Sequence, residues 1–237
     1  MTQTAALRVI EPPGRPSVAD AVFAELHRQI LALDLPPGTR LSEVDVAKAL
    51  GVSRQPVRDA FWRLSKLGFL TIRPQRATTV SNISEEAVMQ ARFIRSAIEA
   101  ETVRVFTERA TEADMAALEA ILEAQRAAVA AQDRALFHEL DDRFHREICE
   151  RGGNGFAWDI IRENKAHMDR VRMLSLSFAS QAAFEDHLRV MAAIRAREPD
   201  RAMLEMRSHL SRIRSQIQRI RAENAGYFDP LPDSPGD

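Results

Sequence analysis

Cysteine is nearly absent from this chain, with Cys149 the only one among 237 residues. A single thiol excludes a disulfide framework, and no cysteine cluster is present that could form a zinc finger. The sequence also lacks an apolar run long enough to cross a bilayer and an N-terminal apolar segment typical of a secretory signal. We therefore expect a cytoplasmic protein without a membrane partner, long enough to bury a core without covalent staples.

Proline and glycine are missing from most of the C-terminal two-thirds. No proline occurs between Pro74 and Pro199, and the glycines in that interval are confined to the cluster Gly152–Gly155. This distribution predicts a compact, turn-rich first part and a second part of long helices. The predicted boundary is a polar joint at residues 81–84, where Ser84 is suited to cap a helix. The expected organisation is a structureless end at 1–14, domains at 15–82 and 84–223, and a second structureless end at 224–237.

Net charge is also nearly absent, at −1 for the whole chain, which by itself argues against a nucleic-acid partner. This average conceals an asymmetry. Residues 15–83 contain ten Lys and Arg against six Asp and Glu, a net +4, whereas residues 84–237 contain 22 against 27, a net −5. A basic first domain joined to an acidic second domain points to nucleic acid for the first domain alone.

Amphipathic stretches dominate the second part. The clearest follows Pro199, where apolar residues from Met203 to Ile220 recur at alternating spacings of three and four. Short connections between such helices are typical of antiparallel neighbours in a bundle. We expect a mainly α protein whose C-terminal helices span residues 85–109, 112–131, 133–151, 155–176, 180–197 and 199–223.

Turn residues and helix caps in the first domain predict a winged helix-turn-helix. Its expected helices span residues 18–33, 43–50 and 54–67. Gly51 stands between the last two helices, where the turn needs a positive φ, and Ser53 is placed as an N-cap. Two short strands at 69–73 and 78–81 would form the wing.

The last of these helices carries the polar groups of a DNA-reading surface. Arg54, Gln55 and Arg58 face outward at its N-terminal end, the end that a recognition helix inserts into the major groove. Arginine can bind guanine, and glutamine adenine, through paired hydrogen bonds. Arg73 and Arg76 add positive charge to the wing. Two arginines alone would more often be a solvated helix face, but the turn, the cap, the wing and the local charge all agree with DNA binding.

The stretch PPGTRLSEVDVAKALGVSRQPVRDAFWRLSKLGFLTIRP resembles the winged helix-turn-helix of the GntR family of bacterial transcription regulators. The likeness spans about residues 17–82 and implies a homodimer on a double-stranded DNA operator with an inverted repeat. It assigns bases to Arg54, Gln55 and Arg58, and phosphates to Ser53, Arg63 and the wing. Ala77 departs from the glycine usual in the wing, and Trp62 stands where a polar residue is more common.

Four chemistry-bearing side chains of the second domain are expected to face its interior. Asp141 and His145 lie four residues apart on one helix face, while His187 and His209 stand beside apolar positions on later helices. Three imidazoles and a carboxylate suit zinc, with nickel or manganese as alternatives, and leave coordination positions open for a ligand. Each histidine alone would more often be an ordinary core residue, so periodicity by itself leaves the metal site open.

The segments LDDRFH, FEDH and RSHL resemble the C-terminal ligand-binding domain, termed FCD, of the FadR-type branch of the GntR family. The likeness covers about residues 88–214 and implies a divalent metal held by Asp141, His145, His187 and His209. Six expected helices rather than seven point to the VanR-like subgroup.

Three arginines are the candidates for binding an effector in this domain. Arg95 matches an arginine of the family and could clamp a carboxylate, and the alternative is a surface ion pair with Glu99. Arg170 and Arg172 are weaker candidates for the same pocket.

The expected function is a DNA-binding regulator, most simply a repressor, whose operator affinity is controlled by a small organic acid bound at the metal. One alternative is a regulator for which the metal itself is the signal. A metalloenzyme is the other, because an aspartate and three histidines with open positions also suit hydrolytic or oxygenase chemistry. No further general base, nucleophile or cofactor loop supports that second alternative.

Overall fold

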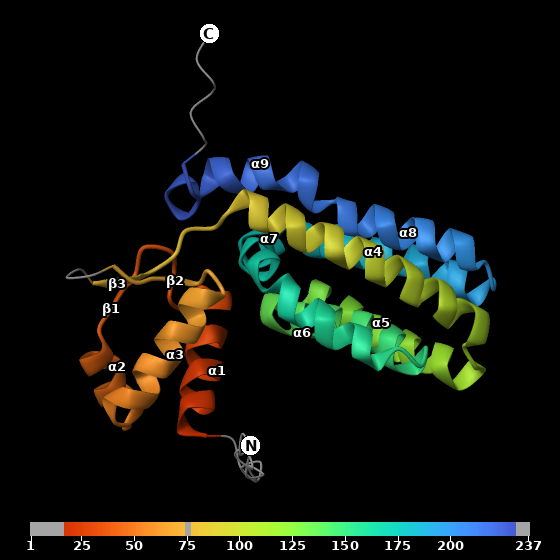
Figure 1. The fold of residues 1–237 in the computed structure, drawn as a ribbon. Helices are drawn as coiled ribbons and strands as arrows, with labels where there is room; N and C mark the ends of the chain where they lie inside the picture. The colour runs from red at the N-terminus through yellow and green to blue at the C-terminus, as the bar shows by residue number, and fades with distance from the viewer. Residues whose placement is uncertain (1–16, 74–76, 231–237) are drawn as a thin grey trace, which may run out of the picture. The chain divides into compact units, whose positions relative to one another are not determined.

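The computed structural model describes residues 17–73 and 77–230, which divide into two units (Figure 1). The first unit comprises the described residues up to Ile30 together with Thr39–Ser81. The second comprises Leu31–Gly38 and the described residues from Asn82 onward. The mainly α fold class expected from the sequence is confirmed.

The first unit is a winged helix-turn-helix built from helices α1 (Val18–Leu31), α2 (Glu43–Leu50) and α3 (Arg54–Lys66). Its small antiparallel sheet has the order β1-β3-β2, formed by β1 (Arg40–Leu41), β2 (Leu70–Thr71) and β3 (Thr78–Val80). The sequence did not predict β1, because two residues are too few to show an alternating pattern. The apolar faces of α1 and α3 supply the core through Val22, Leu26, Ile30, Val57, Phe61 and Leu64.

Two local features of the helix-turn-helix were predicted, and one of them differs in the structure. Gly51 has φ +66° and ends α2 in the left-handed conformation, as the turn requires. Ser53 occupies the N-cap position of α3, but its side chain accepts no hydrogen bond from the first turn, so the expected cap bond is absent. In this unit Ser42 accepts from the backbone N–H groups of Val44 and Asp45 at the start of α2, and Ser17 accepts from Asp20 N–H at 3.1 Å at the start of α1.

The second unit is an antiparallel helical bundle whose elements are α4 (Glu85–Arg109), α5 (Glu112–Ala130), α6 (Arg134–Arg151), α7 (Gly155–Arg195), α8 (Pro199–Ser211), α9 (Ile213–Glu223) and a 3-10 turn at Ala225–Tyr227. Helix α4 lies beside α8 and α7, and α5 lies beside α6 (Figure 1). Ser84 caps α4 as predicted, accepting from Ala87 N–H.

Two helix boundaries were predicted wrongly. Residues 155–176 and 180–197 form one helix, α7, because the expected break contains Ser177, Phe178 and Ala179 and no glycine or proline. The last predicted helix is instead interrupted at Arg212, between α8 and α9. Asn154 occupies the N-cap position of α7 but makes no cap bond, and its amide donates to Gly152 O instead.

Structure continues beyond residue 223, where the sequence predicted none. Ile83 and Phe228 form a parallel β-bridge, with Ile83 N–H donating to Tyr227 O at 2.7 Å and Asp229 N–H donating to Ile83 O at 3.0 Å. Burial is the physical reason, because Phe228 and Ile83 pack in one apolar cluster with Ile217 of α9. The ends at 1–16 and 231–237 lie outside the described residues.

Across residues 17–73 and 77–230, no helix combines the length and apolar composition needed to span a bilayer. Helix α7 has the length, at 41 residues, but its longest stretch without a charged residue, residues 173–184, is too short to cross a bilayer.

Replacing Gly51 by alanine tests the left-handed turn. A Cβ at this position meets no atom within 4 Å, so only the positive φ opposes the substitution. We expect Gly51→Ala to lower the unfolding free energy of the first unit by about 1–2 kcal/mol, and Gly51→Asn to lower it less. Urea unfolding followed by Trp62 fluorescence in a Trp158→Phe background measures this. An alanine variant as stable as the parent would contradict the assignment.

Candidate metal centre and nucleic-acid interface

The four predicted ligands meet in the interior of the second unit. Asp141 and His145 come from α6, His187 from α7 and His209 from α8, and one ligand atom of each lies within 4.8 Å of the others. Side chains three and four residues apart share a helix face, which is why α6 presents both of its ligands together. The side chains of the first three are fully buried, and that of His209 is 9% exposed.

Each histidine is oriented by a partner on its Nδ1 atom. His145 Nδ1 lies 2.5 Å from Glu99 Oε2, His187 Nδ1 lies 2.9 Å from Gln125 Oε1, and His209 Nδ1 lies 3.3 Å from Asp186 Oδ2. Gln125 is itself oriented, because its amide nitrogen donates to Leu140 O at 3.0 Å. At His187 and His209 these acceptors favour the ring proton on Nδ1 and leave Nε2 with a free lone pair, the arrangement found at metal-binding histidines.

The atoms that face one another in this cluster lack hydrogen-bond partners within the described residues. These atoms are His145 Nε2, His187 Nε2 and Asp141 Oδ1. His187 Nε2 lies 3.6 Å from Asp141 Oδ1, and His145 Nε2 lies 3.9 Å from Asp141 Oδ2. Buried polar atoms are normally satisfied, so convergent orphans of this kind fit a divalent cation.

The protonation states also suit a metal. Burial lowers the pKa of His209 to about 3 and holds that of His187 well below its usual range, so both imidazoles are neutral at pH 7. Burial opposes ionisation of Asp141, but Arg172 and the neighbouring histidines hold its pKa well below the ordinary value. The cluster therefore offers one carboxylate and the neutral imidazoles of His187 and His209, the forms that bind metals.

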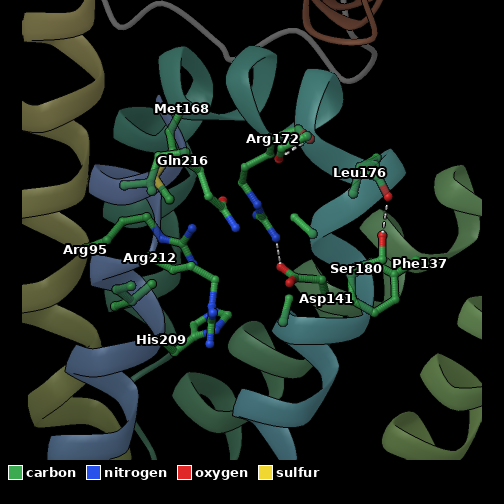
Figure 2. Close-up of a pocket in the computed structure, with 15 residues that line it drawn as sticks. Arg95, Phe137, Asp141, Met168, Arg172, Leu176, Ser180, His209, Arg212 and Gln216 are labelled. Carbon is green, nitrogen blue, oxygen red and sulfur yellow. Dashed lines mark hydrogen bonds and ion pairs between the residues drawn. The ribbon is translucent and has the colours of Figure 1, made fainter. Parts of the chain in front are cut away.

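A cavity of about 60 Å³ adjoins the cluster and is lined by Asp141, His209, Arg95, Arg172 and Gln216, among others (Figure 2). Arg172 forms an ion pair with Asp141 and a second with Asp142 at 3.4 Å. Two of the three arginines predicted to bind an effector therefore reach the cavity.

Arg95 is buried, which rules out the alternative of a surface ion pair. Its Nε donates to Glu99 Oε1 at 2.5 Å, while Glu99 Oε2 faces His145. Glu99 thus connects the arginine to a predicted metal ligand. The Nη2 atom of Arg95 is buried and has no hydrogen-bond partner within the described residues.

Arg170 does not line this cavity, so the prediction that it binds the effector there is not supported by its position. Its Nη2 donates to Asn82 O at 3.1 Å, at the joint that precedes α4. Burial lowers the pKa of Arg170 to about 10. Residues 170 and 172 project from nearly opposite sides of a helix, which separates their roles.

Sequence reasoning missed Gln125, Asp186 and Arg212. Gln125 is a fully buried amide on the otherwise apolar face of α5, and a polar residue at such a position was the available signal. Asp186 lies against His209 Nδ1 and accepts a hydrogen bond from Arg212 Nε at 2.7 Å. Its place beside His187 gave no indication of this contact, since adjacent residues point in different directions.

A second group, His138 with Asp142 and Asp169, also has ligand atoms within 4.8 Å of one another. Lys165 Nζ lies 2.7 Å from an oxygen of Asp142 and 2.6 Å from one of Asp169. The ammonium group therefore already supplies a cation, and this cluster is a partly buried ion-pair network.

The DNA-reading side chains predicted on α3 are exposed at its N-terminal end. Arg54 and Arg58 both form ion pairs with Glu43 of α2, at 3.2 and 3.1 Å. Gln55 donates to Asp59 at 3.0 Å within α3. The sequence did not predict Glu43 as the shared partner, which holds both arginines at the N-terminal end of α3.

The predicted phosphate contacts differ in their surroundings. Arg63 bonds to Asp20 at 2.7 Å and lies over the ring of Phe23, so it is engaged within the unit. Ser53 and Arg73 are exposed, and Arg76 lies outside the described residues. Trp62, whose role the sequence did not indicate, is 59% exposed.

Comparison with known proteins agrees with both halves of the structure. Residues 18–80 match bacterial regulatory proteins of the gntR family, and residues 90–212 match the FCD domain. The chain is similar to the HTH-type transcriptional repressor RspR of Escherichia coli K12, with 37% identity over 213 residues that cover 89% of this chain and 93% of the relative. An HTH-type transcriptional regulator in an unstable DNA locus of Streptomyces ambofaciens is 31% identical over 209 residues, covering 87% of this chain and 88% of that protein.

Among solved structures, E. coli McbR/YncC aligns with a TM-score of 0.71 over 88% of this chain and 99% of that chain. The identity is 22%, so this likeness concerns the fold. The matching family consists of transcription regulators rather than enzymes. With its winged helix-turn-helix and its C-terminal FCD domain, the chain belongs to the GntR family of bacterial DNA-binding transcription regulators.

Proposed function

We propose that this chain is a repressor whose first unit binds a double-stranded operator and whose second unit controls that binding in response to a small organic acid. The exposed N-terminal end of α3 supports the proposal that the first unit binds DNA. There, Arg54, Gln55 and Arg58 present hydrogen-bond donors of the kind that read base edges. The name of the similar repressor RspR supports the sign of regulation. The subgroup within the family, VanR-like, stays a prediction.

The proposed operator is an inverted repeat read by a homodimer. Two copies related by a twofold axis present two α3 helices to half-sites about one helical turn apart. On binding, Arg54 and Arg58 exchange Glu43 for base or phosphate oxygens. Loss of the ion pairs with Glu43 makes binding to mismatched DNA sites less favourable. A base that offers no acceptor leaves the arginine without a partner.

The second unit is proposed to hold a divalent metal through Asp141, His145, His187 and His209, with zinc first and nickel or manganese as alternatives. The observation that supports it is that buried nitrogen and oxygen atoms without hydrogen-bond partners converge on one point. The imidazole rings that carry these nitrogen atoms are held by contacts at Nδ1. A bound ion supplies Lewis-acid positions open to a carboxylate oxygen.

Arg95 and Arg172 are proposed to bind the effector's remaining polar groups. Arg95 is held in place by Glu99 and has an unpartnered Nη2. Arg172 neutralises Asp141 in this structure. When a metal ion neutralises that carboxylate instead, the guanidinium of Arg172 becomes available to a carboxylate ligand in the cavity.

Regulation requires that the effector bind one arrangement of the two domains better than the other. We propose that residues 82–84 transmit the effect of ligand binding to the first unit. Other residues of the second unit contact this segment at several points. Arg170 donates to Asn82 O, and the backbone of Ile83 pairs with that of residues 227–229. Helix α9, which begins at the cavity-lining Ile213, also packs in the apolar cluster around Ile83.

Arg58→Ala tests the recognition surface. Loss of a bidentate base contact is expected to reduce discrimination between operator and mismatched DNA by about ten- to a hundredfold. Lys66→Ala removes the same charge from the opposite end of α3 and is the matched control, expected to weaken all DNA about equally. Electrophoretic mobility shift with an operator and single-base variants measures both. Unchanged sequence preference in Arg58→Ala would refute the assignment.

His187→Ala tests the metal centre. Removing one ligand should abolish stoichiometric metal, as determined by elemental analysis, while operator binding by the first unit persists. His167→Ala, on the same helix but outside the cluster, should retain full metal content. Full metal occupancy in His187→Ala would defeat the site. Operator binding by the parent protein that responds to zinc alone would identify the metal as the signal in place of an organic acid.

Glu99→Gln tests the orientation of His145. A neutral amide accepts more weakly from Nδ1–H, and loss of such a partner typically lowers metal affinity about 10- to 100-fold. Glu101→Gln, two residues along α4 and paired with Arg104 on the surface, is the control. Competition for zinc with a chromophoric chelator gives both affinities. Equal affinities would show that Glu99 serves Arg95 alone.

A further inference from the structure

Trp62 is a large exposed side chain of the first unit that the proposed function does not use. It is 59% exposed, whereas the adjacent Phe61 is 2% exposed in the core of the unit. We propose that Trp62 and Lys66 bind the sugar–phosphate backbone of DNA at the rim of the major groove. This inference rests on the proposed role of α3 as the recognition helix and deepens it with a contact that carries no sequence information.

The surface proposed to read bases continues to Trp62 along α3. Arg54, Arg58, Trp62 and Lys66 follow one another at steps of four residues, and all four are exposed. Residues four positions apart are neighbours on a helix surface. The surface that begins at the N-terminal end of α3 therefore extends along one side of the helix to its last turn.

The position of Trp62 along the helix suits a phosphate rather than a base. An α-helix rises about 1.5 Å per residue, so Trp62 lies roughly 12 Å beyond Arg54 along the axis. The major groove is only about 8.5 Å deep. When the N-terminal end of α3 reaches the base edges, Trp62 lies at the level of the phosphates that border the groove.

The two side chains offer the groups that a DNA backbone binds. The indole has a donor, Nε1–H, for a phosphate oxygen and an apolar ring face that can pack on deoxyribose. Lys66 Nζ lies 5.6 Å from the centroid of the Trp62 ring, a cation–π contact that holds the ammonium group beside the indole. Asp59, one turn before Trp62, is engaged by Gln55 at 3.0 Å. The positive charge beside the ring favours a polyanion over an apolar protein surface as the partner.

Fluorescence anisotropy of the full chain with two labelled duplexes tests the backbone contact. One duplex has an arbitrary sequence, and the other is selected by the parent protein from a random pool. Trp62→Phe removes the indole donor and should weaken both complexes by the same factor, roughly two- to tenfold. Trp62→Ala also removes the ring and should weaken both complexes further. Trp158→Phe, the same change at a buried position of the second unit, is the control and should change neither affinity.

Salt dependence distinguishes the two side chains. Lys66→Ala should lower the slope of log affinity against log salt concentration by about one, because one fewer counterion is released. Trp62→Phe should leave that slope unchanged, because a neutral donor releases no counterion. Arg126→Ala removes a charge from the surface of the second unit and should also leave the slope unchanged.

Acrylamide quenching of tryptophan fluorescence reports the contact directly. In the Trp158→Phe protein all tryptophan emission comes from Trp62. Saturation with the duplex of arbitrary sequence should lower the quenching constant by about half, because the backbone covers one face of the ring.

The outcomes separate this inference from the proposed function. Unchanged affinity of both Trp62 variants for both duplexes, or quenching that DNA does not alter, overturns the backbone contact. A loss confined to the selected duplex would make Trp62 a base-reading residue, which overturns it as well. Quenching that falls with rising protein concentration in the absence of DNA would assign the indole to a protein–protein contact instead. Failure of the parent protein to select any sequence from the pool defeats the proposed recognition surface itself.

Discussion

The second unit depends on how it accommodates one carboxylate, that of Asp141, in the middle of a helical bundle. A buried anion is costly unless cations or strong donors surround it. Here Arg172 lies on one side and the imidazoles of His145 and His187 on the other. The Nε2 atoms of both imidazoles and Asp141 Oδ1 have no hydrogen-bond partner within the described residues. The proposed metal ion would supply positive charge on that side of the carboxylate.

The same requirement extends outward from the ligands. Glu99, Gln125 and Asp186 each lie against an imidazole Nδ1, and each is in turn bonded to another group: Arg95, the backbone of α6, or Arg212. Orientation of the proposed metal ligands is therefore coupled to the side chains that line the adjacent cavity. In the proposed function, an acid that changes the position of Arg95 or Arg212 also acts on one of these ligands. This would give effector and metal a physical means of influencing each other's binding.

Two arginines of α7 show why the site could be predicted only in part. Arg170 and Arg172 are two residues apart, so they project to opposite sides of the helix, one to the joint at Asn82 and the other to Asp141. Their residue type is the same, and only the packing of α7 against its neighbours determines which faces the cavity. Similarly, the amphipathic pattern predicted that His187 and His209 point inward, but it could not predict that Gln125 and Asp186 would orient them. Those contacts join residues 62 and 23 positions apart.

The sequence by itself determined the class of protein and most of the local elements. The left-handed glycine at the turn, the outward-facing polar residues of α3, the scarcity of helix breakers over the bundle and the i, i+4 spacing of Asp141 and His145 are all local properties of the chain. The tertiary structure decided which charges share a partner, as Arg54 and Arg58 share Glu43, which arginines line the cavity, and that residues 227–229 pair with the joint. These outcomes depend on distances between segments far apart in the chain, and hydrophobic periodicity describes only the face that each helix buries.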